Sequence, residues 1–382
     1  MRHDILAIGL TGQSITDLER RILAEAAPYA VVLFGRNIGG AEQLRELIAE
    51  IKSVSARPPV MMIDQEGGRV DRLRHLIPGL PSAEAFAEGE KPAEMSAWLG
   101  RVIGMALRYF DVECDLAPVV DIRGDASPKG LERRTFGGDP KTVIDLAGAF
   151  MRGLHERGTA SCLKHFPGIG IGSADPHYGA TVIDVPLETL LECDLAPYVA
   201  LGPDAGAIMI GHGTYPQVDR DQPATLSRVM THDLLRGRLH FDGIAISDDM
   251  EMHAVSDLGP YESISERALM AGNDVIMFCS DIERVRDLQR YLEHRVSEDG
   301  AVRARFDEAV RRCEAYRVHC ERLRAAAPRA ASSFDEVIDE VVHFVEEFQR
   351  TRPEHEVVVP ESERRQNSRV PGKGRTGREE WT

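Results

Sequence analysis

Short apolar runs rich in β-branched residues recur along the first 280 residues, and amphipathic segments separate them. The runs cover residues 5–10, 31–34, 60–64, 114–122, 161–166, 207–212, 243–249 and 274–279. They are apolar on both faces, as expected of strands buried in a parallel sheet. Helical periodicity lies between them at 16–27, 41–53, 93–109, 140–157, 187–201, 227–236 and 263–271. The first helix begins with a capping box, Thr16-x-x-Glu19.

This alternation predicts an α/β fold, because parallel strands need crossover connections. Eight strand–helix units indicate a (β/α)8 TIM-type barrel with C-terminal helices, and an open doubly wound sheet is the alternative. We expect the barrel to span residues 1–325. A second capping box, Ser333-x-x-Glu336, opens an amphipathic helical extension over 326–350, whose apolar stripe would pack on the barrel or on a sister subunit. The polar, charged segment 351–382 is expected to be disordered.

Composition narrows the class of protein. Apolar residues make up 43% of the 382 residues, which is typical of a globular chain, and the formal net charge is -16. Such acidity argues against a nucleic-acid partner, which needs clustered Lys and Arg. No apolar run is long enough to span a membrane or form a signal-peptide core, and the six cysteines are scattered. We therefore expect a cytoplasmic protein without membrane or nucleic-acid partners; the oligomeric state is left open.

In such barrels the chemistry lies on loops after the carboxyl ends of the strands. The polar residues at these positions are Asp64, Arg69, Arg72, Asp121, Arg134, Lys164, His165, Asp175, His177, His212, Asp248 and Asp249. Asp248 closes a strand, where a carboxylate is held rigidly, although ion pairing or helix capping would also explain it. In Asp175-x-His177 the Asp can orient the imidazole and stabilise its charged form.

A fixed carboxylate and a protonatable imidazole on one barrel face can displace a leaving group and protonate it as it departs. Asp64, Arg72, Arg134, Lys164 and His165 would add a ring of hydrogen-bonding groups suited to a sugar. A metal-dependent hydrolase would need His-x-His after the first strand, where Leu10-Thr11-Gly12 stands. We expect neither a metal nor a cofactor. The glycines after His165 match no phosphate-binding loop, and loop mobility is their expected use.

Several motifs in order resemble those of glycoside hydrolase family 3, in particular its single-domain β-N-acetylglucosaminidases of peptidoglycan recycling. The motifs are IDQEGGRVDRL (63–73), Arg134-Thr-Phe, LKHFPG (163–168), AIMIGHGTY (207–215), QPATLS (222–227) and ISDDMEM (246–252). The resemblance covers about residues 5–320. The chain departs from the family pattern at Ile169, where a His is usual, and at Pro176, where a Ser is usual.

The resemblance implies roles for individual residues. Asp248 would be the nucleophile and His177 the acid/base, with Asp175 as its partner. Asp64, Arg72, Arg134, Lys164 and His165 would bind a small carbohydrate substrate. The implied activity is a retaining β-N-acetylhexosaminidase acting on muropeptide or chitooligosaccharide fragments. A β-glucosidase, a glycoside phosphorylase of the same fold and a catalytically idle sugar-binding homologue remain as alternatives.

Overall fold

The structure is a computed structural model that describes residues 5–125, 127–174 and 181–352. Its central sheet has the order β7-β6-β3-β2-β1-β15-β14-β11-β8, and all neighbours are parallel. The strands are β1 (Leu6–Gly9), β2 (Ala30–Leu33), β3 (Val60–Ile63), β6 (Cys114–Asp115), β7 (Ala160–Ser161), β8 (Leu163–Phe166), β11 (Ala207–Ile210), β14 (Ile244–Asp249) and β15 (Val275–Phe278). Only Cys162 separates β7 from β8, so the two edges of the sheet are one run of chain. The sheet closes, which confirms the barrel and rules out the open alternative.

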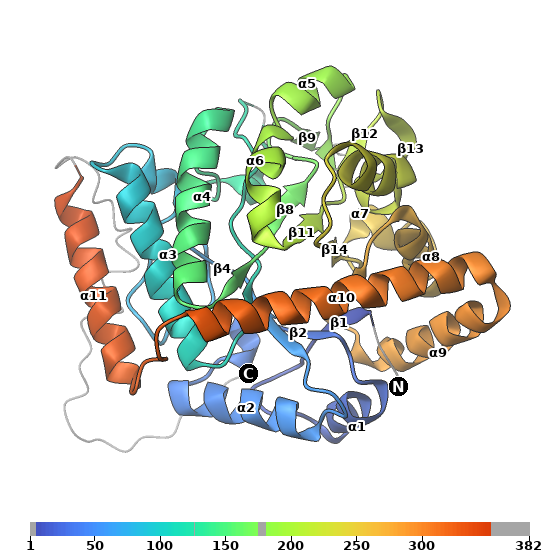
Figure 1. The fold of residues 1–382 in the computed structure, drawn as a ribbon, viewed down its shortest axis with the longest axis horizontal. Helices are drawn as coiled ribbons and strands as arrows, with labels where there is room; N and C mark the ends of the chain where they lie inside the picture. Colours follow the sequence, from blue (N-terminus) through green and yellow to red (C-terminus); the bar gives the residue numbers. More distant parts are fainter. Residues whose placement is uncertain (1–4, 126, 175–180, 353–382) are drawn as a thin grey trace, which may run out of the picture.

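Helices surround the barrel strands (Figure 1). They are α1 (Asp17–Ala26), α2 (Ala41–Val54), α3 (Pro92–Tyr109), α4 (Pro140–Glu156), α5 (Leu187–Glu192), α6 (Ala196–Ala205), the π-type helix η5 (Val229–Arg238), α7 (His253–Ser256), α8 (Tyr261–Ala271) and α9 (Ile282–Glu298). The capping box of α1 is present, since Thr16 accepts from the Glu19 N–H at 3.2 Å and Glu19 accepts from the Thr16 N–H at 2.6 Å. The helix expected over 187–201 is divided into α5 and α6.

Smaller elements decorate the carboxyl ends of the barrel strands. A hairpin of β4 (Gln65–Gly67) and β5 (Val70–Asp71) follows β3. A separate sheet combines β9 (Ser173–Ala174), β10 (Thr181–Val182), β12 (Thr214–Tyr215) and β13 (Asp219–Pro223). Single turns of 3-10 helix occur at η1 (Gly35–Asn37), η2 (Ala83–Phe86), η3 (Lys129–Leu131) and η4 (Ala224–Leu226). These additions build walls around the end of the barrel where chemistry is expected.

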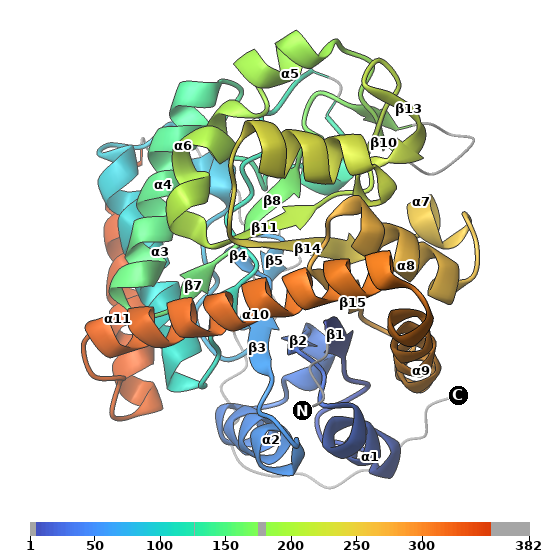
Figure 2. The same ribbon diagram turned by 45° about the vertical axis from the view of Figure 1, so that its right-hand side comes forward.

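Helix α10 (Gly300–Ala326) closes the opposite, amino-terminal end of the barrel. It runs across the strands in both ribbon views (Figures 1 and 2). Its Cys313, Tyr316 and Cys320 are buried in the same cluster as side chains of the barrel interior. The Tyr29 hydroxyl, just before β2, donates to the Cys313 carbonyl at 3.1 Å. The barrel core is therefore completed by a helix that comes after all of its strands.

Helix α11 (Phe334–Arg350) packs on α3, at the edge of the molecule in Figure 1. The apolar stripe predicted for this segment is buried at Val337, Val341, Phe344 and Phe348. Phe344 lies edge-on to Trp98 of α3 with ring centroids 5.6 Å apart, and Phe348 lies 4.8 Å from Phe86. The stripe thus packs on the chain's own barrel. The tail segment from 353 to 382 lies outside the described residues.

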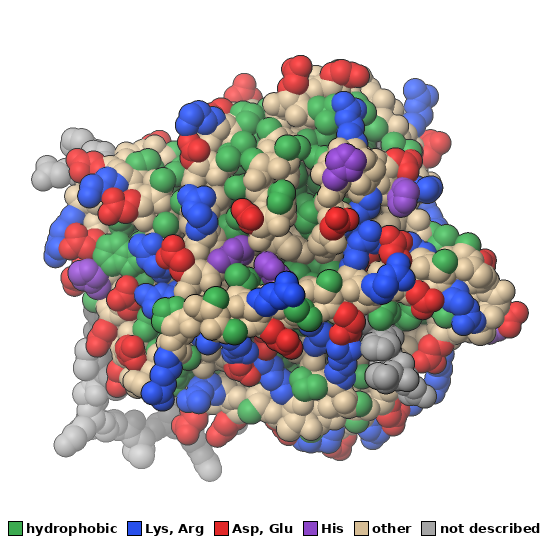
Figure 3. Space-filling model, in the orientation of Figure 1, with side chains coloured by type: hydrophobic (Ala, Val, Ile, Leu, Met, Phe, Trp, Pro, Cys, Tyr) green, Lys and Arg blue, Asp and Glu red, His purple; other side chains and the backbone are tan. Residues whose placement is uncertain are grey.

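Basic and acidic side chains are interspersed on the face shown in Figure 3, and apolar groups are scattered between them. Such mixing is typical of a solvated surface. Across 5–125, 127–174 and 181–352, none of the helices is long and apolar enough to cross a lipid bilayer.

Candidate active site

A cavity of about 250 Å³ opens at the carboxyl ends of the barrel strands. Its polar lining consists of Asp64, Arg72, Arg134, Lys164, His165, Asp248 and Asp249. Its apolar lining consists of Val32, Phe34, Val70, Met209, Met252, Met277 and Cys279. All five residues predicted to bind sugar and the predicted nucleophile therefore meet in one cavity, although they come from positions up to 184 residues apart in the sequence.

A buried ion network forms one wall of this cavity. The Lys164 ammonium lies 2.7 Å from the Asp64 carboxylate and 2.7 Å from that of Glu66. Arg134 donates to both oxygens of Glu66, at 2.7 and 2.8 Å. Burial opposes ionisation of Glu66, but the two cations outweigh it and lower its pKa to about 2. Burial disfavours the charge of Lys164 as well, yet Asp64 and Glu66 raise the pKa of its ammonium above the usual range. Glu66 and Lys164 are thus both charged at neutral pH.

Glu66 was not singled out from the sequence, where it is one of several charged residues in a loop after β3. Its side chain is 5% exposed and contacts two predicted sugar-binding residues. It holds the cationic groups of Lys164 and Arg134 close together, where they can reach a substrate hydroxyl. The signal available in the sequence was its place two residues after Asp64, at a strand end.

Asp248 lies at the end of β14 and is half-buried in the cavity. One of its oxygens accepts from the Asp249 N–H at 2.8 Å, which fixes the carboxylate. Burial would favour the neutral acid, but His212, His165, this N–H group and Lys164 together lower the pKa of Asp248. It therefore stands as a carboxylate at neutral pH, the form in which it can attack an electrophile.

His212 and Asp121 support the site from behind. His212 is buried, with Nδ1 2.6 Å from the Thr225 hydroxyl and Nε2 3.0 Å from the Asp249 carbonyl. Burial lowers the pKa of His212, although the charge of Asp248 opposes this shift. Asp121 contacts Nδ1 of His165 at 2.8 Å and orients that ring toward the cavity. Both were candidates because of their positions at strand ends. Asp121 contacts the ring of His165, and His212 contacts the Asp249 carbonyl.

Other candidates lie elsewhere. Arg69 is exposed, pairs with Glu132 at 3.6 Å and does not line the cavity. Asp175 and His177 lie outside the described residues, so their acid/base role stays a prediction. Asp249 lines the cavity beside Asp248. Burial, together with the charges of Glu251 and Asp248, raises the pKa of Asp249 to about 6.

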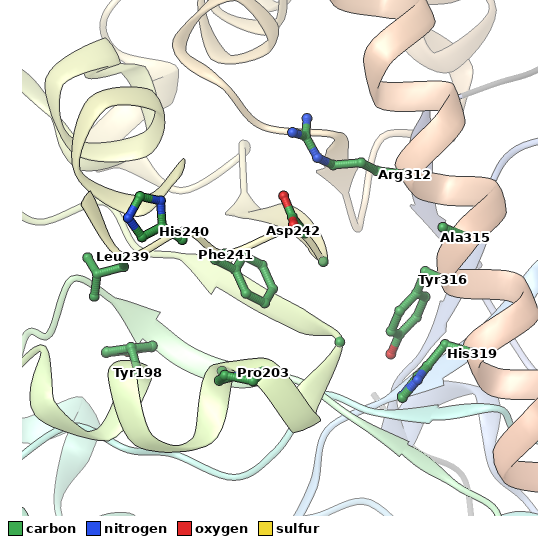
Figure 4. A pocket seen from close by; sticks show the side chains of 13 residues that line it. Tyr198, Pro203, Leu239, His240, Phe241, Asp242, Arg312, Ala315, Tyr316 and His319 are labelled. Carbon is green, nitrogen blue, oxygen red and sulfur yellow. The ribbon is translucent and has the colours of Figure 1, made fainter. Parts of the chain in front are cut away.

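A larger cavity, of about 360 Å³, lies at the amino-terminal end of the barrel between α6, the loop before β14 and α10 (Figure 4). Tyr316 and His319 of α10 face Phe241 and His240 across it. Asp242 is the one carboxylate among its described lining residues. This cavity lacks the paired polar groups found at the carboxyl end of the barrel, and barrel enzymes do not place their chemistry at the amino-terminal end. Within the described ranges, no three His, Cys, Asp or Glu side chains are grouped to hold a metal ion.

Comparison with known proteins identifies the relatives of this chain. The model of the glycosyl hydrolase family 3 N-terminal domain matches residues 4–315. A beta-hexosaminidase of Pseudomonas aeruginosa is 37% identical over 277 residues, which cover 72% of this chain and 82% of that protein.

Solved structures agree. A family 3 beta-N-acetylglucosaminidase from Paenibacillus superposes with a TM-score of 0.80 and 28% identity, over 90% of this chain and 67% of that one. NagZ from Neisseria gonorrhoeae, in complex with N-trifluoroacetyl-D-glucosamine, superposes with a TM-score of 0.72 and 25% identity, over 90% and 98%. The fold, the ordered motifs and the family model covering most of the chain lead to one assignment: this chain belongs to glycosyl hydrolase family 3.

Proposed function

We propose that this chain is a retaining β-N-acetylhexosaminidase that releases terminal β-linked N-acetylglucosamine from muropeptide or chitooligosaccharide fragments. Asp248 acts as the nucleophile, and His177, oriented by Asp175, acts as the acid/base. Asp64, Arg72, Arg134, Lys164 and His165 bind the sugar. The curated relatives of this chain are named beta-hexosaminidases, which supports the hexosaminidase assignment.

One observation carries the proposal: an ionised, backbone-anchored Asp248 shares a small cavity with five side chains able to bind hydroxyl groups. A cavity of about 250 Å³ lies below the range of about 300 to 1,000 Å³ usual for drug-sized ligands, so a single sugar ring suits it. Among the residues that line the cavity, the Asp64 carboxylate presents acceptors, whereas Lys164 and Arg134 present donors. A polyhydroxylated ring uses both kinds of group.

In the first half-reaction, an Asp248 oxygen forms a bond to the anomeric carbon. The glycosidic bond breaks, its electron pair stays on the departing oxygen, and that oxygen takes the proton of the His177 imidazolium. In the second half-reaction, neutral His177 accepts a proton from water as the water oxygen attacks the anomeric carbon. The carboxylate of Asp248 departs, and the β configuration is restored by two inversions.

The test compares chromogenic β-N-acetylglucosaminide and β-glucoside substrates, each with and without phosphate, on wild type and Asp248→Ala. We expect wild type to release N-acetylglucosamine without need of phosphate. Asp248→Ala should lose about 10⁴-fold or more in kcat, because the group that forms the glycosyl-enzyme is removed. The matched control is Asp257→Ala, whose carboxylate is 70% exposed and pairs only with surface His253 among described residues.

A second measurement addresses the acid/base. With an activated leaving group, His177→Ala should accumulate a glycosyl-enzyme, seen in the intact mass as one added N-acetylhexosamine residue on Asp248. Wild-type-like turnover in Asp248→Ala overturns the proposal. Formation of a sugar phosphate would also overturn it and would indicate a phosphorylase. Exclusive cleavage of the glucoside would indicate a glucosidase, and activity on neither substrate would indicate a catalytically idle homologue.

A further inference from the structure

Asp194, which precedes α6, is a buried carboxyl group without a hydrogen-bond partner among the described residues. The residue is 1% exposed, and neither carboxyl oxygen accepts a hydrogen bond from another described residue. Buried polar groups in native proteins are almost always paired, and an unpaired buried carboxylate is costly. The side chain takes no part in the mechanism above, so its position calls for an explanation.

Asp194 packs directly on the stretch of chain that follows His165. A Cβ placed on Gly168 would lie 2.7 Å from Asp194 Cβ and 3.0 Å from its Oδ1, so only glycine leaves room for this carboxyl. Gly168 donates its N–H to the His165 carbonyl at 2.8 Å and accepts from the Tyr215 hydroxyl at 2.7 Å. Asp194 therefore packs against a glycine that is hydrogen-bonded to the backbone of His165.

A second buried carboxyl, that of Asp121, holds the same stretch at other positions. It accepts from the N–H and contacts the ring of His165 at 3.2 and 2.8 Å, and it accepts from the Ile169 N–H at 2.7 Å. Gly170 next along the chain approaches Ile122 so closely that a Cβ would lie 2.0 Å from its carbonyl oxygen. The glycines here serve close packing, a use that the sequence did not indicate. Residues 165–170 form the root of the segment that leads to Asp175 and His177.

The surroundings of Asp194 favour its neutral form. Burial and the nearby charge of Asp121 raise the pKa of Asp194 to about 7. The other polar groups facing it are the phenols of Tyr198 and Tyr215, both buried, and the Cys193 thiol. The Tyr198 hydroxyl has no partner among described residues, and its ring lies edge-on to Phe166 at 5.2 Å. Among the described residues no cation contacts Asp194, and its own backbone N–H, which favours the charged form, is outweighed by burial and by the charge of Asp121.

We propose that Asp194 is a positioning residue for the loop root 165–170. As a neutral carboxyl it allows the root to pack as observed. As a carboxylate it repels the nearby Asp121 and needs hydrogen-bond donors, so the root shifts and His165 leaves its place in the cavity. The proposal rests on the proposed function, since it makes sugar binding by His165 depend on the protonation of Asp194.

The experiment compares the pH profiles of wild type, Asp194→Asn and Asp194→Ala, with Asp204→Asn on the exposed side of α6 as the matched control. With half-ionisation near pH 7, wild type should lose about tenfold in kcat/KM between pH 6 and pH 8 through this group, chiefly by a rise in KM. Neither Asp194 variant can ionise at residue 194, so both should lack this rise in KM. Asp204→Asn should follow wild type.

Thermal unfolding gives a readout independent of catalysis. The ordinary pKa of Asp is 3.8 and the folded value is about 7, so folding destabilises the charged form of Asp194. The midpoint temperature of wild type should fall relative to those of both variants as pH rises from about 4 to 7. Above pH 7 the difference in midpoint temperature should stay constant. Identical pH profiles of KM in wild type and both variants overturn the proposal, and so does a flat difference in midpoint. If Asp248→Ala retained activity, the proposed function would fail. The unfolding test would still show whether the carboxyl group of Asp194 has a raised pKa in the folded protein.

Discussion

Glu66→Gln tests the buried ion network most directly. The substitution keeps the shape of the side chain and removes its charge. Lys164 and Arg134 direct three hydrogen bonds or ion contacts at the two carboxylate oxygens. An amide has one acceptor oxygen, so its NH₂ group would face a cation. Lys164 would keep Asp64 as its partner, whereas Arg134 would lose its carboxylate.

The magnitude follows from the pKa of Glu66. A value lowered from 4.5 to about 2 in a fully buried group corresponds to about 3 kcal/mol of stabilisation of the charged form. Removing one partner of a buried ion pair costs about 3 to 5 kcal/mol in other proteins, which agrees. Because the folded pKa is depressed, this stability is fully present above pH 4.5 and is lost as pH falls through 2.

Urea unfolding of wild type and Glu66→Gln at pH 7 and at several values below pH 4.5 measures the effect. We expect a difference of about 3 kcal/mol at pH 7 that narrows below pH 4.5. KM should rise in the variant, because the cationic groups of Lys164 and Arg134 are no longer held together. Glu132→Gln, with a 70% exposed side chain, is the control and should change stability by less than about 0.5 kcal/mol. A Glu66→Gln protein as stable as wild type at pH 7 refutes the reasoning.

Two further predictions concern regions away from the cavity. Phe344→Ala should lower the free energy of unfolding by about 3 to 5 kcal/mol, because the ring is fully buried against Trp98. The control Val342→Ala changes a side chain of α11 that is 38% exposed, and it should lower the free energy of unfolding by about 0.5 kcal/mol or less. Equal effects of the two substitutions would show that α11 does not pack as described. Asp274→Asn should lower the free energy of unfolding in urea by about 3 to 5 kcal/mol, because this fully buried carboxylate pairs with Arg236 and with Arg305. KM should be unchanged at temperatures where the variant is folded. A rise in KM would contradict the separation of the two barrel ends.

The strands were predictable because each is buried on both faces and therefore reads as a continuous apolar run. The run 114–122 was the least accurate, since the ladder in β6 ends at Asp115. Pro118 has no N–H group to donate, and the chain beyond it keeps one bridge, from Val119 to Lys164. The helix expected over 187–201 is interrupted before Pro197, which opens α6 at its first turn.

The candidate site was predictable where a polar residue ends a strand, as at Asp64, Lys164 and Asp248. Partners that come from distant segments were not. Glu66 acquires its importance only when β8 brings Lys164 beside it, 98 residues along the chain. Asp194 follows no strand, and in the sequence it lies inside the helix predicted over 187–201, where an acidic residue is expected on the solvent face. Its burial against Gly168 is a property of the closed barrel and has no local signature.

Helix α10 also constrains how the chain can be made. Its Tyr316 hydroxyl reaches the Cys114 thiol at 3.1 Å inside the base of the barrel, so the interior stays open until this helix exists. When all eight strands have been synthesised, helix α10 has not yet been made. The amino-terminal end of the barrel interior therefore stays exposed in the nascent chain until residue 320 has left the ribosome. Residue 315, where the family match ends, lies inside α10. A chain shortened to that boundary would keep every barrel strand and the first part of α10, but it would lose Tyr316 and Cys320, which are buried against the barrel interior.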